Sequence, residues 1–219
     1  MLKENLYALF KEIENCNNLG EKITLVGATK FVDIERVNTA IDLGLAHIGE
    51  NRAQEFRDKF ESYHPCVKHF IGTLQENKLK YVVGKADIID SVSSTKLATA
   101  ISNKAEQLCI VQKVMLEINA GDEESKTGAS LNQAKAVYKS IIGLKSLELV
   151  GVMAMLPISD DEQVLAKSCQ NVRAFYDEIR TQMPTVKYLS VGMSSDYKIA
   201  IQNGSNMIRI GSALFGKRS

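Results

Sequence analysis

The 219-residue sequence predicts an α/β fold, a (β/α)8 TIM-type barrel with an extra N-terminal helix, in which residues 1–219 form a single domain. Three observations predict it. Short apolar runs typical of buried strands alternate with amphipathic helical windows along the whole chain. Eight such strands are found, and no linker, repeat or low-complexity tract separates them. The length and the 45% hydrophobic content suffice for one sizeable core but not for two large domains.

The first half of the chain supplies four strands and the helices that follow them. The N-terminal helix is expected over residues 1–15, where leucines recur on one side and charged residues on the other. Asp33 is the expected cap of the helix after the first strand, and Gly44 its end. The expected strands are 23–29, 46–48, 67–72 and 87–92. One helix follows each strand. The first carries Ile34, Val37 and Ile41, and the second runs to about residue 62. The third spans 75–83, and the fourth has Leu97, Ile101, Ala105 and Leu108 at helical spacing.

The second half repeats the alternation. Ser130 and Gln133 form a capping-box pattern, as do Ser159 and Glu162 at the start of the longest helix. The inner face of that longest helix is expected to include Val164, Leu165, Val172, Phe175 and Ile179. The expected strands are 110–119, 147–155, 187–191 and 206–210. Residues 120–128 are expected to form a polar loop. Residues 194–196 are expected to cap a helix that ends at 203–204, and a last short helix starts at Ser212.

Composition and charge exclude several classes of function. The formal net charge is +1 with scattered lysines and arginines, so there is no basic stripe for nucleic acid and no polybasic membrane patch. The longest apolar run, about residues 149–156, falls well short of the roughly 20 residues needed to span a bilayer. The N-terminal segment lacks the apolar core of a signal peptide. We therefore expect a cytoplasmic monomer whose partner is a small molecule.

Cysteine and histidine spacing argues against a metal site. The cysteines are far apart and lack the two-residue spacing of zinc or redox motifs, which favours reduced thiols in a cytoplasm. No two histidines stand at i, i+4, so no metal site is expected. The residues are Cys16, Cys66, Cys109 and Cys169, and His47, His64 and His69.

Lys30 is the strongest candidate for chemistry. It directly follows the first strand, and an amine at the end of a buried strand loses water, which favours the neutral form that attacks an aldehyde. In a barrel the strand ends share one face, so Lys30 should lie near Asn51, Ser194 and Arg209. Taken alone, Lys30 also fits an ordinary solvated lysine.

The loops after the last two strands offer a phosphate site. Segment 192–195 can present a hydroxyl and backbone amides, and Gly211 with Ser212 lets the backbone approach closely at the start of the last helix. Ordinary helix capping explains either segment equally well on its own. A covalent lysine, a partner for a ring nitrogen and a phosphate site are together the requirements of pyridoxal 5'-phosphate.

Two other segments receive plainer interpretations. Residues 125–128 contain Lys-Thr-Gly in the wrong order for a nucleotide-binding loop and are interpreted as part of the polar loop after the fifth strand. Met153 and Met155, at the end of the sixth strand, are interpreted as core residues, with contact to a cofactor ring as the alternative.

The combination resembles the pyridoxal-phosphate homeostasis proteins, which look like the barrel domain of alanine racemase without its second domain. The resemblance covers essentially the whole chain. It rests on Lys30, on 49–51 (Gly-Glu-Asn), 69–72 (His-Phe-Ile-Gly) with Leu74, Gln75, Asn77 and Lys78, on 192–194 (Gly-Met-Ser) with Asp196, and on 209–216 (Arg-Ile-Gly-Ser-Ala-Leu-Phe-Gly).

The resemblance implies roles for six residues. Lys30 forms a Schiff base with the cofactor, Arg209 faces the pyridine nitrogen, and Asn51 lies near the ring. The phosphate is held by Ser194, Gly211 and Ser212. The family often has Ser and His where this chain has Thr29 and Thr73, which leaves a role for position 73 in doubt.

Arg209 also bears on activity. A permanently protonated arginine disfavours a protonated ring nitrogen and so weakens the ring as an electron sink. Racemisation also needs an acid/base group on each face of the substrate. By the resemblance, the second group comes from a domain for which this chain has no room. The leading hypothesis is therefore a protein that holds, buffers and delivers pyridoxal phosphate, with apo-enzymes and small amino acids as further partners and no catalytic residues of its own.

Two enzymatic alternatives remain at this level. One is a pyridoxal-phosphate-dependent racemase or related lyase that acts on small amino acids. The weaker one is a phosphate-binding barrel isomerase that uses Lys30 on a sugar aldehyde.

Overall fold

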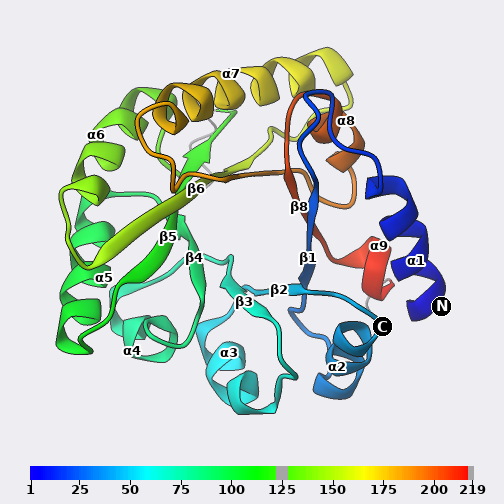
Figure 1. The fold of residues 1–219 in the computed structure, drawn as a ribbon, viewed down its shortest axis with the longest axis horizontal. Coiled ribbons are helices and arrows are strands. Elements are labelled where there is room, and N and C mark those ends of the chain that lie inside the picture. Colours follow the sequence, from blue (N-terminus) through cyan, green and yellow to red (C-terminus); the bar gives the residue numbers. More distant parts are fainter. Residues whose placement is uncertain (122–127, 217–219) are drawn as a thin grey trace.

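A computed structural model describes residues 1–121 and 128–216, which form a closed barrel of parallel strands surrounded by helices (Figure 1). The strand order around the barrel is the order along the chain, β1 to β8. The predicted TIM-type barrel is therefore confirmed. The strands are β1 (Thr24–Ala28), β2 (His47–Glu50), β3 (Val67–Phe70), β4 (Ile88–Val92), β5 (Gln112–Asn119), β6 (Leu147–Met155), β7 (Tyr188–Val191) and β8 (Met207–Ile210).

Helices follow the strands and cover the outside of the barrel. The α-helices are α1 (Leu2–Ile13), α2 (Ile34–Asp42), α3 (Ala53–Lys59), α4 (Leu79–Val82), α5 (Thr95–Gln107), α6 (Leu131–Ile142), α7 (Glu162–Arg180), α8 (Tyr197–Gln202) and α9 (Ser212–Phe215). Two 3-10 turns, η1 (Phe60–Ser62) and η2 (Glu76–Lys78), adjoin α3 and α4. None of the helices within 1–121 and 128–216 is long and apolar enough to cross a membrane.

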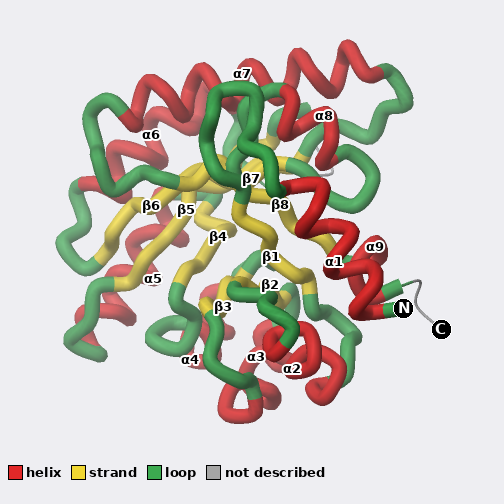
Figure 2. The backbone as a smooth tube through the Cα atoms, turned by 45° about the vertical axis from the view of Figure 1, so that its right-hand side comes forward, coloured by secondary structure: helices red, strands yellow, loops and turns green. Residues whose placement is uncertain are grey.

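Closure of the barrel joins the two ends of the chain. Thr24 pairs with Met207 and Val26 with Arg209, which places β1 directly beside β8. The extra helix α1 packs over the same region, next to α9 (Figure 2), and the Asn5 side chain donates a hydrogen bond to the carbonyl oxygen of Leu214 at 3.1 Å. Residues from both ends of the sequence therefore reach one part of the barrel mouth.

Apolar side chains fill both the inside and the outside of the barrel. A small buried cluster, Val26, Ile88, Met115, Val150, Met153 and Met207, joins strands from around the barrel. A larger cluster lies between the strands and the helices, and it includes Phe70, Ile89, Ile101, Leu116, Val137, Val152, Val172 and Tyr176. Burial on this scale is the main source of stability for such a fold.

Two of the predicted helix caps are confirmed. The Asp33 carboxylate accepts a hydrogen bond from the Arg36 N–H at 2.8 Å at the start of α2. Ser130 and Gln133 form the expected reciprocal capping box of α6. Each capping side chain accepts a hydrogen bond from a backbone N–H group that has no acceptor within the first helical turn.

Other sequence predictions were wrong at this level of detail. Asp161, not Ser159, caps α7 through the Gln163 N–H, and Val164 is exposed rather than on the inner face. Strand β5 begins at Gln112, two residues later than expected, after a turn in which Cys109 adopts a positive φ of 54°. The segment 75–83 is a 3-10 turn followed by a short helix. In the polar loop, residues 122–127 lie outside the described residues, and with them most of the 125–128 segment.

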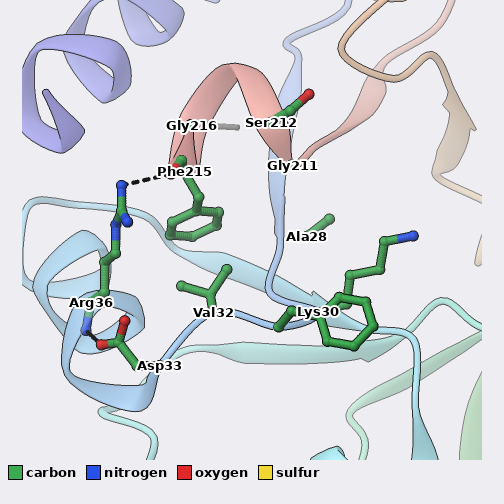
Figure 3. A pocket seen from close by; sticks show the side chains of 10 residues that line it. Ala28, Lys30, Val32, Asp33, Arg36, Gly211, Ser212, Phe215 and Gly216 are labelled. Atoms are coloured by element: carbon green, nitrogen blue, oxygen red, sulfur yellow. Dashed lines mark hydrogen bonds between the residues drawn. The ribbon is translucent and has the colours of Figure 1, made fainter. Parts of the chain in front are cut away.

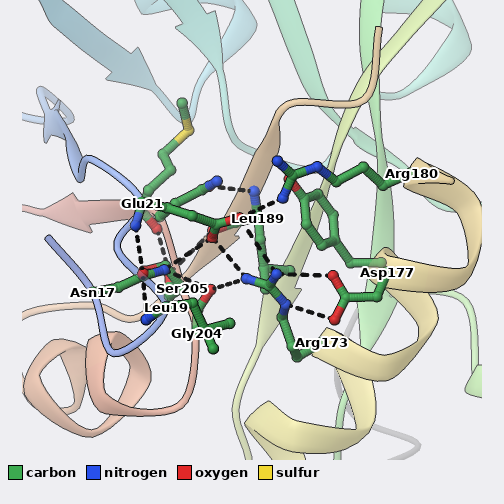
Figure 4. Close-up of polar contacts among 12 residues, drawn as sticks. Asn17, Leu19, Glu21, Arg173, Asp177, Arg180, Leu189, Gly204 and Ser205 are labelled. Atoms are coloured by element: carbon green, nitrogen blue, oxygen red, sulfur yellow. Dashed lines mark hydrogen bonds and ion pairs between the residues drawn. The ribbon is translucent and has the colours of Figure 1, made fainter. Parts of the chain in front are cut away.

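A polar cluster ties the segment before β1 to α7 (Figure 4). Arg173 donates to Glu21 at 2.7 Å and to the carbonyl oxygen of Gly204 at 2.8 Å, and Arg180 also pairs with Glu21. Burial acts to raise the pKa of Glu21, but hydrogen bonds from Arg173, Asn17 and Arg180 outweigh it and lower that pKa to about 2. The cluster therefore fixes the start of β1 to the helix layer.

Candidate binding site at the barrel mouth

A pocket of about 300 Å³ lies at the carboxyl ends of the strands, where barrels of this type carry their functional groups. All six residues predicted from the sequence line it: Lys30, Asn51, Ser194, Arg209, Gly211 and Ser212. The remaining lining residues are Ala28, Ile71, Met153, Met155, Met193 and Ser195. The volume is at the lower end of the range for small-molecule sites.

Lys30 enters the pocket from the turn after β1. The preceding Thr29 is fully buried, and its backbone N–H donates to the carbonyl oxygen of Gly49 at 2.9 Å, which anchors the strand end. The following residue, Phe31, adopts a positive φ of 62°, a conformation that is unfavourable for a bulky side chain. Lys30 is half-buried, and Figure 3 shows its amino group pointing away from Arg36 and Asp33. A constrained turn therefore presents this amine.

Glu50 supports the site from the neighbouring strand. Its carboxylate is 1% exposed and accepts hydrogen bonds from the Asn51 N–H at 2.7 Å and the Arg52 N–H at 3.3 Å. Burial raises the pKa of Glu50, while these N–H groups and Lys59 act against the rise. The sequence pointed to the Gly-Glu-Asn segment at 49–51, but no role was predicted for Glu50. The signal that could have indicated one is an acidic residue at the end of a buried strand.

Asn51 carries an unsatisfied polar atom beside this pocket. Its side-chain Oδ1 is buried and has no hydrogen-bond partner among the described residues. The backbone of Asn51 lies so close to Gly72 that a Cβ there would be 1.9 Å from the Asn51 carbonyl oxygen. A buried acceptor without a partner is costly unless a ligand or water satisfies it.

Arg209 forms a buried cationic wall. It is 5% exposed, donates to the Ser190 carbonyl oxygen at 2.6 Å and hydroxyl at 2.9 Å, and donates to the Ala154 carbonyl oxygen at 3.0 Å. Burial lowers the pKa of Arg209, while carboxylates, Asp90 first among them, oppose that shift. These partners fix the plane of the guanidinium from two neighbouring strands.

The loops after β7 and β8 meet at Ser194. Its hydroxyl accepts a hydrogen bond from the Ala213 N–H at 3.3 Å, which links the β7–α8 loop to the first turn of α9. The loop is shaped by Gly192, with a φ of 105°, and by Asp196, whose carboxylate accepts from the Met193 N–H at 2.5 Å. The sequence predicted that residues 194–196 cap α8, but the Asp196 side chain makes no cap hydrogen bond to this helix. Asp196 instead stabilises the loop.

A wider groove of about 780 Å³ adjoins the pocket and shares Lys30, Gly211 and Ser212 with it (Figure 3). Its outer wall includes Arg36, whose Nη2 donates to the carbonyl oxygen of Phe215 at 2.6 Å. Lys30 is thus accessible from a solvent-facing groove as well as from the pocket.

The remaining sequence expectations can also be placed. Met153 is 2% exposed, so the core interpretation is confirmed, and both Met153 and Met155 also line the pocket. Thr73 is exposed and is not among the lining residues. The four cysteines are free, and the described residues hold no cluster of three or more His, Cys, Asp or Glu side chains suited to a metal ion.

Comparison with known proteins gives consistent relatives. The family model of the alanine racemase N-terminal domain matches residues 8–219. The chain is 35% identical to the pyridoxal phosphate homeostasis protein of Aquifex aeolicus over 94% of this chain and 89% of that protein. The structure of PipY from Synechococcus elongatus with PLP bound has a TM-score of 0.84 and 27% identity, covering 99% of this chain and 100% of that one. Alanine racemase from Clostridium difficile has a TM-score of 0.79 at 18% identity and covers 98% of this chain and 60% of that one, a likeness of fold alone.

The closed barrel and these matches define a protein of the alanine racemase N-terminal-domain class. Within that class, the chain belongs to the pyridoxal phosphate homeostasis protein family. The resemblance noted from the sequence is thereby confirmed.

Proposed function

We propose that this protein binds pyridoxal 5'-phosphate at the barrel mouth and holds it for buffering and delivery to other proteins. The observation that carries the proposal is the convergence of Lys30, Arg209 and Ser194 on one pocket from β1, β8 and the loop after β7. The unsatisfied Asn51 Oδ1 supports a polar ligand there. The relative with bound PLP supports this choice of ligand.

The proposed roles follow from the chemistry of each side chain. When bound, the cofactor supplies the aldehyde to which Lys30 attaches covalently. Arg209 faces the ring nitrogen as a hydrogen-bond donor that cannot accept a hydrogen bond and does not give up its proton, and Asn51 lies beside the ring. The hydroxyls of Ser194 and Ser212 and the backbone at Gly211 hold the phosphate.

We further propose that the protein does not turn over amino acids. Among the described residues that line the pocket, Lys30 and Arg209 are the only two with ionisable side chains. Racemisation needs an acid/base group on each face of the substrate, and an arginine at the ring nitrogen leaves the ring a weak electron sink. The names of the relatives, homeostasis proteins, fit this proposal. Small amino acids are then transient ligands, and apo-enzymes that require the cofactor are the recipients.

Titration with pyridoxal phosphate tests the binding proposal. The purified chain should develop the visible absorbance of a lysine-bound cofactor, and Lys30→Ala should abolish it because no other amine lines the described pocket. Lys22→Ala is the matched control, since Lys22 precedes β1 where Lys30 follows it. A band that persists in Lys30→Ala, or is lost equally in Lys22→Ala, would refute the assignment of Lys30.

A further inference from the structure

The turn that presents Lys30 has a strained backbone. Phe31 adopts a φ of 62°, a conformation that bulky side chains rarely take. Its side chain is 54% exposed, so burial in the core does not enforce this conformation. A strained residue of this kind persists only where the surrounding structure fixes it. The contacts that fix the turn therefore bear on where the Lys30 amine lies.

Two side chains of α3 hold the backbone directly after Lys30. The Phe31 N–H donates to the Glu55 Oε2 at 3.2 Å. The Lys59 Nζ donates to the Val32 carbonyl oxygen at 2.9 Å and to the same Glu55 oxygen at 3.1 Å. Each of these hydrogen bonds has at least one ionised partner, which makes it stronger than a bond between neutral groups. Glu55 and Lys59 thus act as a linked pair on two consecutive residues of the turn.

The spacing along the helix puts these contacts on one face of α3. Arg52, at the N-cap, is followed by Glu55 and Lys59 at i+3 and i+7, and residues so spaced share a helix face. The Arg52 guanidinium lies 4.4 Å from the centre of the Phe31 ring, within the range of a cation–π contact. This face of α3 therefore contacts both the backbone and the ring of Phe31.

Glu50 holds the turn on its other side. Its Oε2 accepts from the Thr29 hydroxyl at 3.1 Å and lies 3.7 Å from the Lys59 Nζ. The Glu50 side chain is 1% exposed and that of Lys59 is 19% exposed, so this ion pair is largely shielded from water. The chain is therefore held on both sides of Lys30, before it by Glu50 and after it by α3.

The Lys30 amine itself takes no part in these contacts. Within residues 1–121 and 128–216 it has no hydrogen-bond or ion-pair partner. Its place in the pocket is therefore set by the backbone of the turn and by its own rotamers. A displacement of about 1 Å can slow the reaction of a group about a hundredfold, so the geometry of the turn matters for attachment to a cofactor.

We propose that Glu55 and Lys59 are positioning residues that hold the turn 30–32 and thereby place the Lys30 amine for covalent attachment to the aldehyde of pyridoxal phosphate. In that step the neutral amine adds to the aldehyde carbon, one water molecule leaves, and a carbon–nitrogen double bond replaces the carbonyl bond, with no oxidant or reductant. The attachment rests on the proposed function, whereas the contacts of α3 with the turn belong to the unliganded chain.

NMR of the unliganded chain tests the contact with the turn. In Glu55→Ala the Phe31 amide proton should move upfield and exchange about fivefold faster or more, because its charged acceptor is gone. Asp58→Ala is the matched control, since Asp58 accepts from the Arg57 Nε at 2.6 Å on the exposed side of the same helix. An unchanged Phe31 amide in Glu55→Ala would refute the proposal, as would an equal change in the control.

Two ligands separate the positioning of Lys30 from general support of the pocket. Pyridoxal phosphate can attach to the lysine, whereas 4'-deoxypyridoxine 5'-phosphate has the same ring and phosphate but a methyl group in place of the aldehyde. Glu55→Ala and Lys59→Met should each raise the dissociation constant for pyridoxal phosphate about tenfold and change that for the deoxy ligand less than about twofold. Lys59→Arg, which keeps a charged donor, should retain most of the wild-type affinity. Equal weakening of both ligands, or weakening of neither, would overturn the proposal.

The two measurements keep different failures apart. If the wild type binds neither ligand, the proposed function fails, and the Phe31 amide still decides whether α3 holds the turn. If Lys59→Met does not fold, the comparison of the two ligands in Glu55→Ala decides.

Discussion

At the scale of single residues, Arg209 limits the chemistry that the pocket can support. Its guanidinium is fixed by Ser190 and Ala154 and lies in the wall of the pocket that also contains Lys30. An arginine can donate to a ring nitrogen but does not transfer a proton to it near neutral pH. In the proposed binding mode, the residue that faces the pyridine nitrogen would therefore also restrain the use of the ring as an electron sink, which favours retention of the cofactor over turnover.

The proposed phosphate contacts give the first prediction. Ser194→Ala with Ser212→Ala should raise the dissociation constant for pyridoxal phosphate about a hundredfold or more, because each of the two charge-assisted hydrogen bonds contributes about 1.5–3 kcal/mol. Titration by absorbance measures the change. Ser62→Ala, at an exposed serine outside the pocket, is the control. Equal dissociation constants for the double variant and the wild type would rule out this phosphate site.

Which site residues could be predicted from sequence depends on where they lie. Lys30 and Arg209 are adjacent to or within apolar strands, so barrel geometry alone brings them to one face. Glu50 was missed, although its hydrogen bonds are local and an acidic residue at the end of a buried strand was an available signal. The close approach of Gly72 to Asn51 was also missed, because it depends on the spacing between β2 and β3. Neither motif spacing nor composition reports such distances.

At the scale of elements, the β7–α8 loop depends on Gly192. Its φ is 105°, and a Cβ there would lie 2.8 Å from the Tyr197 Cα. Gly192→Ala should therefore lower the free energy of unfolding by roughly 1–3 kcal/mol and weaken cofactor binding through Ser194. Urea denaturation and titration measure the two effects.

Gly20→Ala is the control for that substitution, since Gly20 also has a positive φ of 77°, but a Cβ there would meet nothing within 4 Å. It should show the backbone cost alone and leave binding unchanged. Equal effects of the two variants on binding would contradict a specific role for the β7–α8 loop.

The cluster around Glu21 gives a pH-dependent prediction. The pKa of Glu21 is about 2 in the folded chain against 4.5 ordinarily, so its carboxylate stabilises the fold above about pH 4.5, and this contribution is lost as the pH falls toward 2. Glu21→Gln should lower the free energy of unfolding by about 2–3 kcal/mol at pH 7 and by roughly half of that or less at pH 3.

Urea denaturation at both pH values measures this difference. Glu106→Gln, at an exposed position of α5, should change stability by no more than about 0.5 kcal/mol. A loss for Glu21→Gln that is the same at pH 3 as at pH 7 would show that the carboxylate's charge is not the source of the stabilisation.

Helix caps show where local sequence suffices. Asp33 and Ser130 cap their helices as predicted, because the chain around each offers one suitable side chain. The start of α7 offers Ser159, Asp160 and Asp161 in a row, and the pattern alone could not choose among them. The geometry of the preceding loop makes that choice.

At the scale of the whole molecule, the barrel brings together residues that are remote in sequence. Lys30 and Arg209 line one pocket because β1 pairs with β8. The alternation of strands with helices predicted the eight strands, and the count of eight β/α units predicted that they close into a barrel. We also propose that residues 1–219 act as one domain.

The carrier function predicts no turnover of amino acids. Incubation of the loaded protein with L-alanine in deuterated water should show no sustained loss of the Cα proton by NMR, because the described pocket has no second acid/base group opposite Lys30. Incubation of the Lys30→Ala variant with the same concentration of pyridoxal phosphate is the control. Sustained exchange, or formation of the D-isomer, that disappears in Lys30→Ala would favour the racemase alternative.

Covalent trapping tests the central claim most directly. The protein loaded with pyridoxal phosphate would be reduced with borohydride, digested and mapped by mass spectrometry. If the cofactor is held as proposed, one phosphopyridoxyl group should be found per chain, on the peptide that contains Lys30. A phosphopyridoxyl group on a different lysine, or spread over many lysines in proportion to their exposure, would contradict the account.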